Sequence, residues 1–68
     1  MSLVKAYRER KKLSQRDLAG LVGVSQVTIS EWEKGDKLPT GDRLLRLAKV
    51  IGKRPSQILA DYYDDRAA

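Results

Sequence analysis

Cysteine and histidine are both missing from this sequence of 68 residues. Without them it can form no disulfide bond, no zinc site built on those side chains, and no histidine general base. No apolar run approaches the roughly 18 residues that a transmembrane helix needs, and the N-terminus lacks the hydrophobic stretch of a signal peptide. We therefore expect a single-domain cytoplasmic protein that is not an enzyme, has no cofactor or evident small-molecule ligand, and does not enter a membrane.

Positive charge is in excess, with 14 Lys and Arg against 9 Asp and Glu and a formal net charge of +5. Such a balance favours polyanionic partners. The charge is unevenly spread: residues 1–12 carry +4, residues 13–35 carry −1, residues 36–54 carry +4 and residues 55–68 carry −2. If the polyanion is a nucleic acid, this pattern suits base contacts from the nearly neutral segment and phosphate contacts from the two basic segments.

Residues 15–34 contain two short helical patterns separated by Gly23. Ser14 and Asp17 have the spacing of a capping box, Gly23 can end the first helix with a positive φ, and Ser25 can cap the second. The side turned inward is predicted to consist of Leu18, Ala19, Leu21, Val22, Ile29, Trp32 and Glu33. The opposite face of the second helix is predicted to carry Gln26, Val27, Ser30, Glu31 and Lys34.

The stretch LSQRDLAGLVGVSQVTISEWEKG, residues 13–35, resembles the helix-turn-helix of the lambdoid phage repressor and Cro family, which many bacterial regulators share. The resemblance extends more loosely to YRERKK before it and LPTGDRLLRLAKVIG after it. It implies an all-α fold, a compact five-helix bundle like the lambda repressor DNA-binding domain, spanning residues 1–63 with the helix-turn-helix at 15–34. The small polar residues 64–68 are expected to form a disordered tail.

Three further helices are expected around this motif. The first spans about residues 2–11, the fourth is capped by Thr40 and closed by Gly52, and the fifth begins at Pro55. The chief contribution to the core is expected from Leu44, Leu45, Leu47, Ala48 and Ile51. Lys12 stands where relatives commonly have a glycine, so either a left-handed lysine is tolerated here or the turn differs.

Arg8 falls on the side of the first helix that should face the core. In the family that this chain resembles, an arginine at the matching place pairs with a glutamate near the end of the recognition helix, here Glu33. The resemblance therefore implies a partly buried ion pair between the first and third helices. The alternative is an Arg8 that extends its charged head into water and a solvated Glu33.

The function implied is sequence-specific binding of double-stranded DNA by insertion of helix 26–34 into the major groove. Gln26 is the first candidate for base contact, because an amide can donate to and accept from adenine, unless it caps its own helix. Val27 can contact thymine methyl groups, as a valine does in close relatives among the lambdoid repressors. Ser30 and Glu31 follow one turn later, where Glu31 either accepts from cytosine or pairs with Lys34 or a neighbouring arginine.

Gln15 matches a glutamine that in this family bonds a backbone phosphate and supports the first recognition residue. The other phosphate candidates, which are solvated surface residues in the alternative reading, are Thr28, Lys34, Lys37 and Arg43. The fifth helix contributes to the subunit contact in lambdoid repressors, which implies a contact through Ile58, Tyr62 and Tyr63. The alternative is that the tyrosines cap the core.

The resulting hypothesis is a transcriptional regulator, most simply a repressor, that acts as a homodimer at a palindromic operator. It would work in the bacterial cytoplasm or nucleoid and could be encoded by a phage. An antitoxin and a helical protein-interaction module stay open as alternatives. The chain is expected to be either a whole Cro-like protein or the amino-terminal part of a longer repressor.

Overall fold

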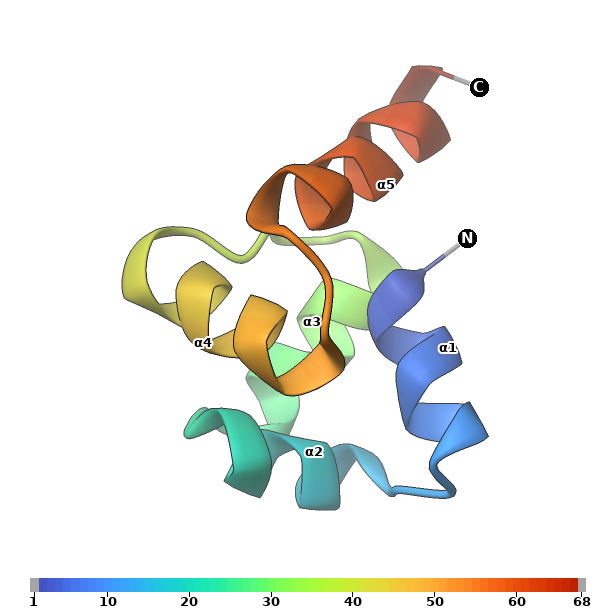
Figure 1. The fold of residues 1–68 in the computed structure, drawn as a ribbon. Helices are drawn as coiled ribbons and strands as arrows, with labels where there is room; N and C mark the ends of the chain where they lie inside the picture. Colours follow the sequence, from blue (N-terminus) through green and yellow to red (C-terminus); the bar gives the residue numbers. More distant parts are fainter. Residues whose placement is uncertain (1, 68) are drawn as a thin grey trace.

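The computed structural model describes residues 2–67, with side chains described as far as Tyr63. Within that range it consists of helices and connecting turns, without a strand (Figure 1). The helices are α1 (Leu3–Arg10), α2 (Gln15–Val22), α3 (Gln26–Lys34), α4 (Gly41–Ile51) and α5 (Pro55–Ala67). The expected all-α, five-helix architecture is confirmed.

Serine side chains begin the first three helices. The predicted capping box is present, because Ser14 Oγ accepts from the Asp17 amide at 2.9 Å and Asp17 Oδ2 accepts from the Ser14 amide at 3.1 Å. Ser25 Oγ accepts from the Thr28 amide at 3.1 Å at the start of α3. Thr40 stands at the N-cap position of α4 as predicted, but its side chain makes no capping hydrogen bond. Local chemistry therefore fixes where α2 and α3 begin.

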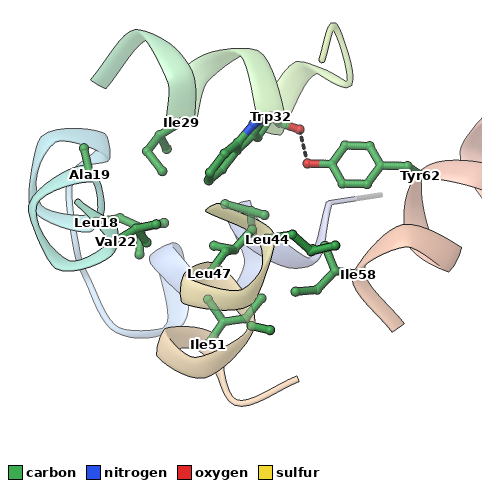
Figure 2. Packing of buried hydrophobic residues seen from close by; sticks show 12 residues of the cluster. Leu18, Ala19, Val22, Ile29, Trp32, Leu44, Leu47, Ile51, Ile58 and Tyr62 are labelled. Carbon is green, nitrogen blue, oxygen red and sulfur yellow. Dashed lines mark hydrogen bonds between the residues drawn. The ribbon is translucent and has the colours of Figure 1, made fainter. Parts of the chain in front are cut away.

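The core takes one stripe of side chains from each helix (Figure 2). Most of the core residues come from α2 and α4, which pack against each other. The single tryptophan, Trp32 of α3, points into the middle of the core. The buried hydrophobic residues are Val4, Leu18, Ala19, Val22, Ile29, Trp32, Leu44, Leu47, Ala48, Ile51, Ile58 and Tyr62.

Leu21 and Leu45, which helical spacing assigns to the core, are instead exposed by 58% and 60%. Leu21 directly precedes the buried Val22, and Leu45 directly follows the buried Leu44. Neighbouring positions in a helix differ by about 100° around its axis. Because α2 and α4 bury narrow stripes, that rotation carries both leucines onto the surface. The expectation for these two residues is therefore wrong.

Helix α5 closes the core rather than offering a broad apolar face to a partner. Ile58 is fully buried, and Tyr62 is 5% exposed with its hydroxyl donating to the Trp32 carbonyl oxygen at 2.7 Å. Tyr62 therefore lies where the alternative expected it, against the core, and Ile58 is also used within the chain, which corrects the prediction that these two residues take part in a subunit contact. Tyr63, exposed by 58%, is the one residue of that prediction that stays available.

The sequence predicts an ordered domain ending at residue 63 and a disordered tail over residues 64–68. Helix α5 continues to Ala67, beyond the expected boundary, while Ala68 and the side chains after Tyr63 lie outside the described residues. The disordered tail stays a prediction.

Lys12 adopts the left-handed conformation, with φ of 57°, in the turn that ends α1. Lys12→Gly is therefore expected to raise the free energy of unfolding by about 0.5–1 kcal/mol, because glycine has no Cβ to strain there. Urea denaturation would measure the change. Lys11→Gly is the matched control: Lys11 has an ordinary φ of −88°, so glycine there should only destabilise. If the Lys12→Gly protein is no more stable than the parent, the left-handed lysine is not strained.

Candidate nucleic-acid interface

Helix α3 divides cleanly into a hidden side and an exposed side. Ile29 and Trp32 are exposed by 0% and 2%, which anchors the helix on the core. Gln26 and Val27, at its N-terminal end, are exposed, and Val27 keeps 67% of its surface accessible. Ser30 is partly exposed one turn further on. The side of α3 that is predicted to contact bases, with Gln26, Val27, Ser30 and Glu31, is therefore exposed at the N-terminal end of the helix.

The turn before α3 depends on Gly23, whose φ of 83° ends α2 in the left-handed conformation. Its amide donates to the Ala19 carbonyl at 2.8 Å, and the Val24 amide reaches the same carbonyl at 3.0 Å. A Cβ at position 23 would lie only 2.9 Å from Nη1 of Arg46, which extends from α4 over the turn. The left-handed backbone at position 23 therefore favours glycine, whereas the Arg46 head group ends a flexible side chain and can move aside. The two helices are separate rods.

A charged network ties the recognition helix to the two helices before it. Arg8 Nε and Nη2 donate to the two carboxylate oxygens of Glu33 at 2.6 Å and 3.0 Å, a bidentate pair, and Arg8 Nη1 donates to the Leu13 carbonyl at 3.1 Å. Gln15 Nε2 donates to Glu33 Oε1 at 3.1 Å. The Arg8 and Glu33 side chains are exposed by only 17% and 5%. The ion pair that the resemblance implies is present in the structure.

Burial opposes ionisation of the Glu33 carboxyl, but hydrogen bonds from Arg8 and Gln15 and the charge of Arg8 outweigh it, so the pKa of Glu33 is lowered. The pKa of Arg8 is raised, first by its hydrogen bond to Glu33. At the start of α2, the pKa of Asp17 is also lowered, first by the backbone hydrogen bond from Ser14. All three groups are therefore charged near neutral pH.

The free energy of unfolding is expected to fall as the pH drops below about 4.5. A carboxyl whose folded pKa is lower than its unfolded pKa stabilises the fold above the unfolded value, near 4.3 for glutamate, and loses this contribution as it protonates in the folded state. Urea denaturation at pH 7, 5 and 3 would show the loss. Glu33→Gln should reduce the acid-side slope, whereas Glu9→Gln, on the exposed face of α1, should retain it; equal slopes in both variants would contradict the assignment to Glu33.

Gln15 is placed differently from the sequence expectation. Its amide is committed to Glu33, and no hydrogen bond joins it to Gln26, so the structure does not show Gln15 supporting the first recognition residue. The physical reason is the acceptor: a buried, charged carboxylate attracts an amide donor more strongly than an exposed amide side chain does. One amide hydrogen and the carbonyl oxygen of Gln15 take no part in that bond, so phosphate contact by Gln15 stays a prediction.

A groove of about 270 Å³ runs between the outer side of α3 and the beginning of α4. It brings together four of the predicted interface residues, Thr28, Glu31, Lys37 and Arg43, which come from three different segments. Lys34 is exposed at the end of α3 but does not line this groove, and neither does Gln15. Two cations beside the outer face of the helix suit a polyanion that follows the groove.

Glu31 pairs with Lys37, with 3.5 Å between Oε2 and Nζ, rather than with Lys34 or an arginine. The lysine side chain is 71% exposed, so this pair contributes little to stability. Thr28 is engaged too, since its hydroxyl lies 2.9 Å from that of Ser25. Thr28 and Glu31 therefore each have a partner within the chain.

Sequence reasoning missed the contacts of Arg46 and Asp61, and it assigned no partner to the hydroxyl of Tyr62. Arg46 covers the turn and pairs with Asp42 at 3.3 Å, and the i, i+4 spacing of the two residues is a signal that was available. Asp61 accepts from the Leu3 amide at 3.0 Å, and Tyr62 donates to Trp32. These last two contacts join residues far apart in the chain, and no local pattern announces them.

Comparison with known proteins agrees with this geometry. Residues 4–58 match a protein-family model described as helix-turn-helix. The HTH-type transcriptional regulator DicA of Escherichia coli (strain K12) is 41% identical over 56 residues, which cover 82% of this chain and 42% of DicA. Repressor protein C2 of Salmonella phage P22 is 39% identical over 56 residues, covering 82% of this chain and 26% of that protein.

A solved structure is also similar. The nuclear magnetic resonance structure of the DNA-binding domain of the P22 C2 repressor has a TM-score of 0.73 and 38% identity, and the match covers 84% of this chain and 75% of that one. The chain spans less than half the length of DicA and of the C2 repressor. Within residues 2–67, none of the helices has the length and apolar character needed to traverse a bilayer.

Proposed function

This chain belongs to the helix-turn-helix family of the XRE type, and we propose that it binds double-stranded DNA in a sequence-specific manner and regulates transcription. The observation that carries the proposal is the division of α3: Ile29 and Trp32 are hidden while Gln26 and Val27 are exposed at its N-terminal end. A DNA major groove is wide enough for a helix, and its base edges offer the donors, acceptors and methyl groups that such side chains recognise.

The roles of the individual side chains follow from their chemistry. Gln26 is proposed to donate to and accept from an adenine, and Val27 to contact a thymine methyl group. Ser30 and Glu31 are proposed to complete the base contacts. Phosphates on either side of the groove are proposed to be bound by Gln15, Thr28, Lys34, Lys37 and Arg43.

Two copies of the chain are proposed to bind a palindromic operator. Helix α3 has nine residues, so it is about 14 Å long and can cover only a few base pairs. Two half-sites about one helical turn apart would supply the remaining contacts, with the two copies related by a two-fold axis. Tyr63, the exposed aromatic residue of α5, is the proposed subunit contact. The relatives named as a regulator and a repressor support repression, and the proposed location is the bacterial cytoplasm.

Selection from a pool of random DNA duplexes tests the proposal directly. An enriched inverted repeat is expected, with half-sites about one helical turn apart. Enrichment of a single half-site would support base reading but contradict the dimer. Recovery of no motif would overturn sequence-specific binding and favour a helical module that binds a protein partner.

A further inference from the structure

The polar contacts that join α3 to other helices converge on two consecutive residues, Trp32 and Glu33. Arg8 of α1 and Gln15 of α2 bind the Glu33 carboxylate, and Tyr62 of α5 binds the Trp32 carbonyl. Three helices therefore fix the C-terminal half of α3. The exposed residues at its N-terminal end are positioned by the Gly23 turn and the buried Ile29, and also by these contacts one and a half to two turns away.

The Tyr62 contact is short, buried and well defined. The hydroxyl donates to the Trp32 carbonyl at 2.7 Å (Figure 2). The same carbonyl accepts from the Gly35 amide at 3.2 Å. Burial raises the pKa of Tyr62, so the hydroxyl keeps its proton throughout the pH range in which the protein is studied. The bond thus couples the position of α5 to the end of the recognition helix.

The residue next to Tyr62 offers a natural comparison. Asp61 Oδ2 accepts from the Leu3 amide at 3.0 Å and so joins α5 to α1 instead of α3. Ile58, fully buried, supplies hydrophobic docking for the same helix. Among the side chains of α5 that are described, those as far as Tyr63, two make polar contacts with other helices, and only the contact of Tyr62 reaches α3.

We propose that Tyr62 is a positioning residue for base recognition, acting through the Trp32 carbonyl. The inference rests on the proposed function, and it gives α5 a role in reading DNA beyond closing the core. Gln26 lies six residues before Trp32, which is about 9 Å along the axis, so a tilt of about 10° at the fixed end displaces Gln26 by about 1.5 Å. A hydrogen bond to a base edge does not survive a displacement of that size.

The test compares Tyr62→Phe with Asp61→Ala. Each removes one polar contact of α5, because neither phenylalanine nor alanine has a polar side-chain atom, and each leaves the buried Ile58 in place. The measured quantity is the ratio of affinities for the selected duplex and a scrambled duplex, at a temperature where every variant is fully folded. Tyr62→Phe is expected to lower this ratio about fivefold, which corresponds to the loss of one hydrogen bond between Gln26 and a base, while Asp61→Ala changes it by less than about twofold.

Equal ratios in Tyr62→Phe and the parent would overturn the inference, as would equal losses in both variants, because either result would leave Tyr62 with a structural role only. A parent protein with a ratio of one would instead refute the proposed function itself. Should Tyr62→Phe unfold at the assay temperature, all three proteins are compared in the Lys12→Gly background, where the relieved strain lies far from α5 in the sequence.

Discussion

Arg8→Met is expected to lower the free energy of unfolding by about 3 kcal/mol, because it leaves the Glu33 carboxylate buried without its cation. The carboxylate loses two hydrogen bonds, at 2.6 Å and 3.0 Å, and the Leu13 carbonyl loses its donor. Only Gln15 would still donate to Glu33. In a domain of this size the change corresponds to a fall in melting temperature of roughly 15 °C, measurable by circular dichroism.

Two further variants show whether this loss comes from the unpaired charge. Arg8→Met combined with Glu33→Leu should recover most of the stability, since an apolar pair of similar volume replaces the ions. Arg10→Met is the control on the same helix: Arg10 is exposed and lies 5.7 Å from the centre of the Tyr7 ring, so its loss should cost little. If Arg8→Met melts with the parent, the buried pair does not stabilise the fold.

Gln26→Ala is expected to weaken binding to the selected operator by about 1–3 kcal/mol and to relax the preference at one base pair. The glutamine is exposed at the first position of α3, so its removal should leave the fold and its stability nearly unchanged. Affinities for a set of duplexes that differ at single positions would identify the base pair concerned. Binding to unrelated duplexes should stay close to that of the parent.

Lys37→Ala is the counterpart that should weaken every duplex alike. Its ammonium group is proposed to contact phosphate, and loss of one such contact reduces the slope of log K against log[salt] by about one unit. The loop position of Lys37, with its side chain 71% exposed, makes structural damage negligible. Should Gln26→Ala and Lys37→Ala weaken all sequences to the same extent, the proposed division between base reading and phosphate binding is wrong.

Most of the local structure could be predicted from the sequence, because it depends on neighbours along the chain. The capping box at Ser14 and the left-handed Gly23 are of this kind. The inward placement of Ile29 and Trp32 also followed from helical spacing. The pairing of Arg8 with Glu33 joins residues 25 positions apart, and only the family resemblance indicated it.

The residues that were assigned wrongly depend on packing between helices rather than on neighbours along the chain. Spacing tells which residues lie on one side of a helix, but the width of the buried stripe depends on the neighbouring helices, and for that reason Leu21 and Leu45 were misassigned. The apolar side of α5 was recognised, whereas its partner surface was not, so Ile58 and Tyr62 were assigned to a subunit contact. Whether Gln26 and its neighbours contact bases remains a prediction for the binding measurements.

The bonds made by Asp61 and Tyr62 also have a kinetic consequence. They span 58 and 30 residues of the chain, whereas the turn between α2 and α3 closes over a few positions. Closing a loop over a long separation costs conformational entropy before the contacts at its ends have formed. The last helix should therefore dock late in folding. During synthesis the helix-turn-helix can assemble first, and it acquires its final support only after residue 62 has left the ribosome. The fluorescence of the single tryptophan, whose carbonyl receives that support, would report this closing step.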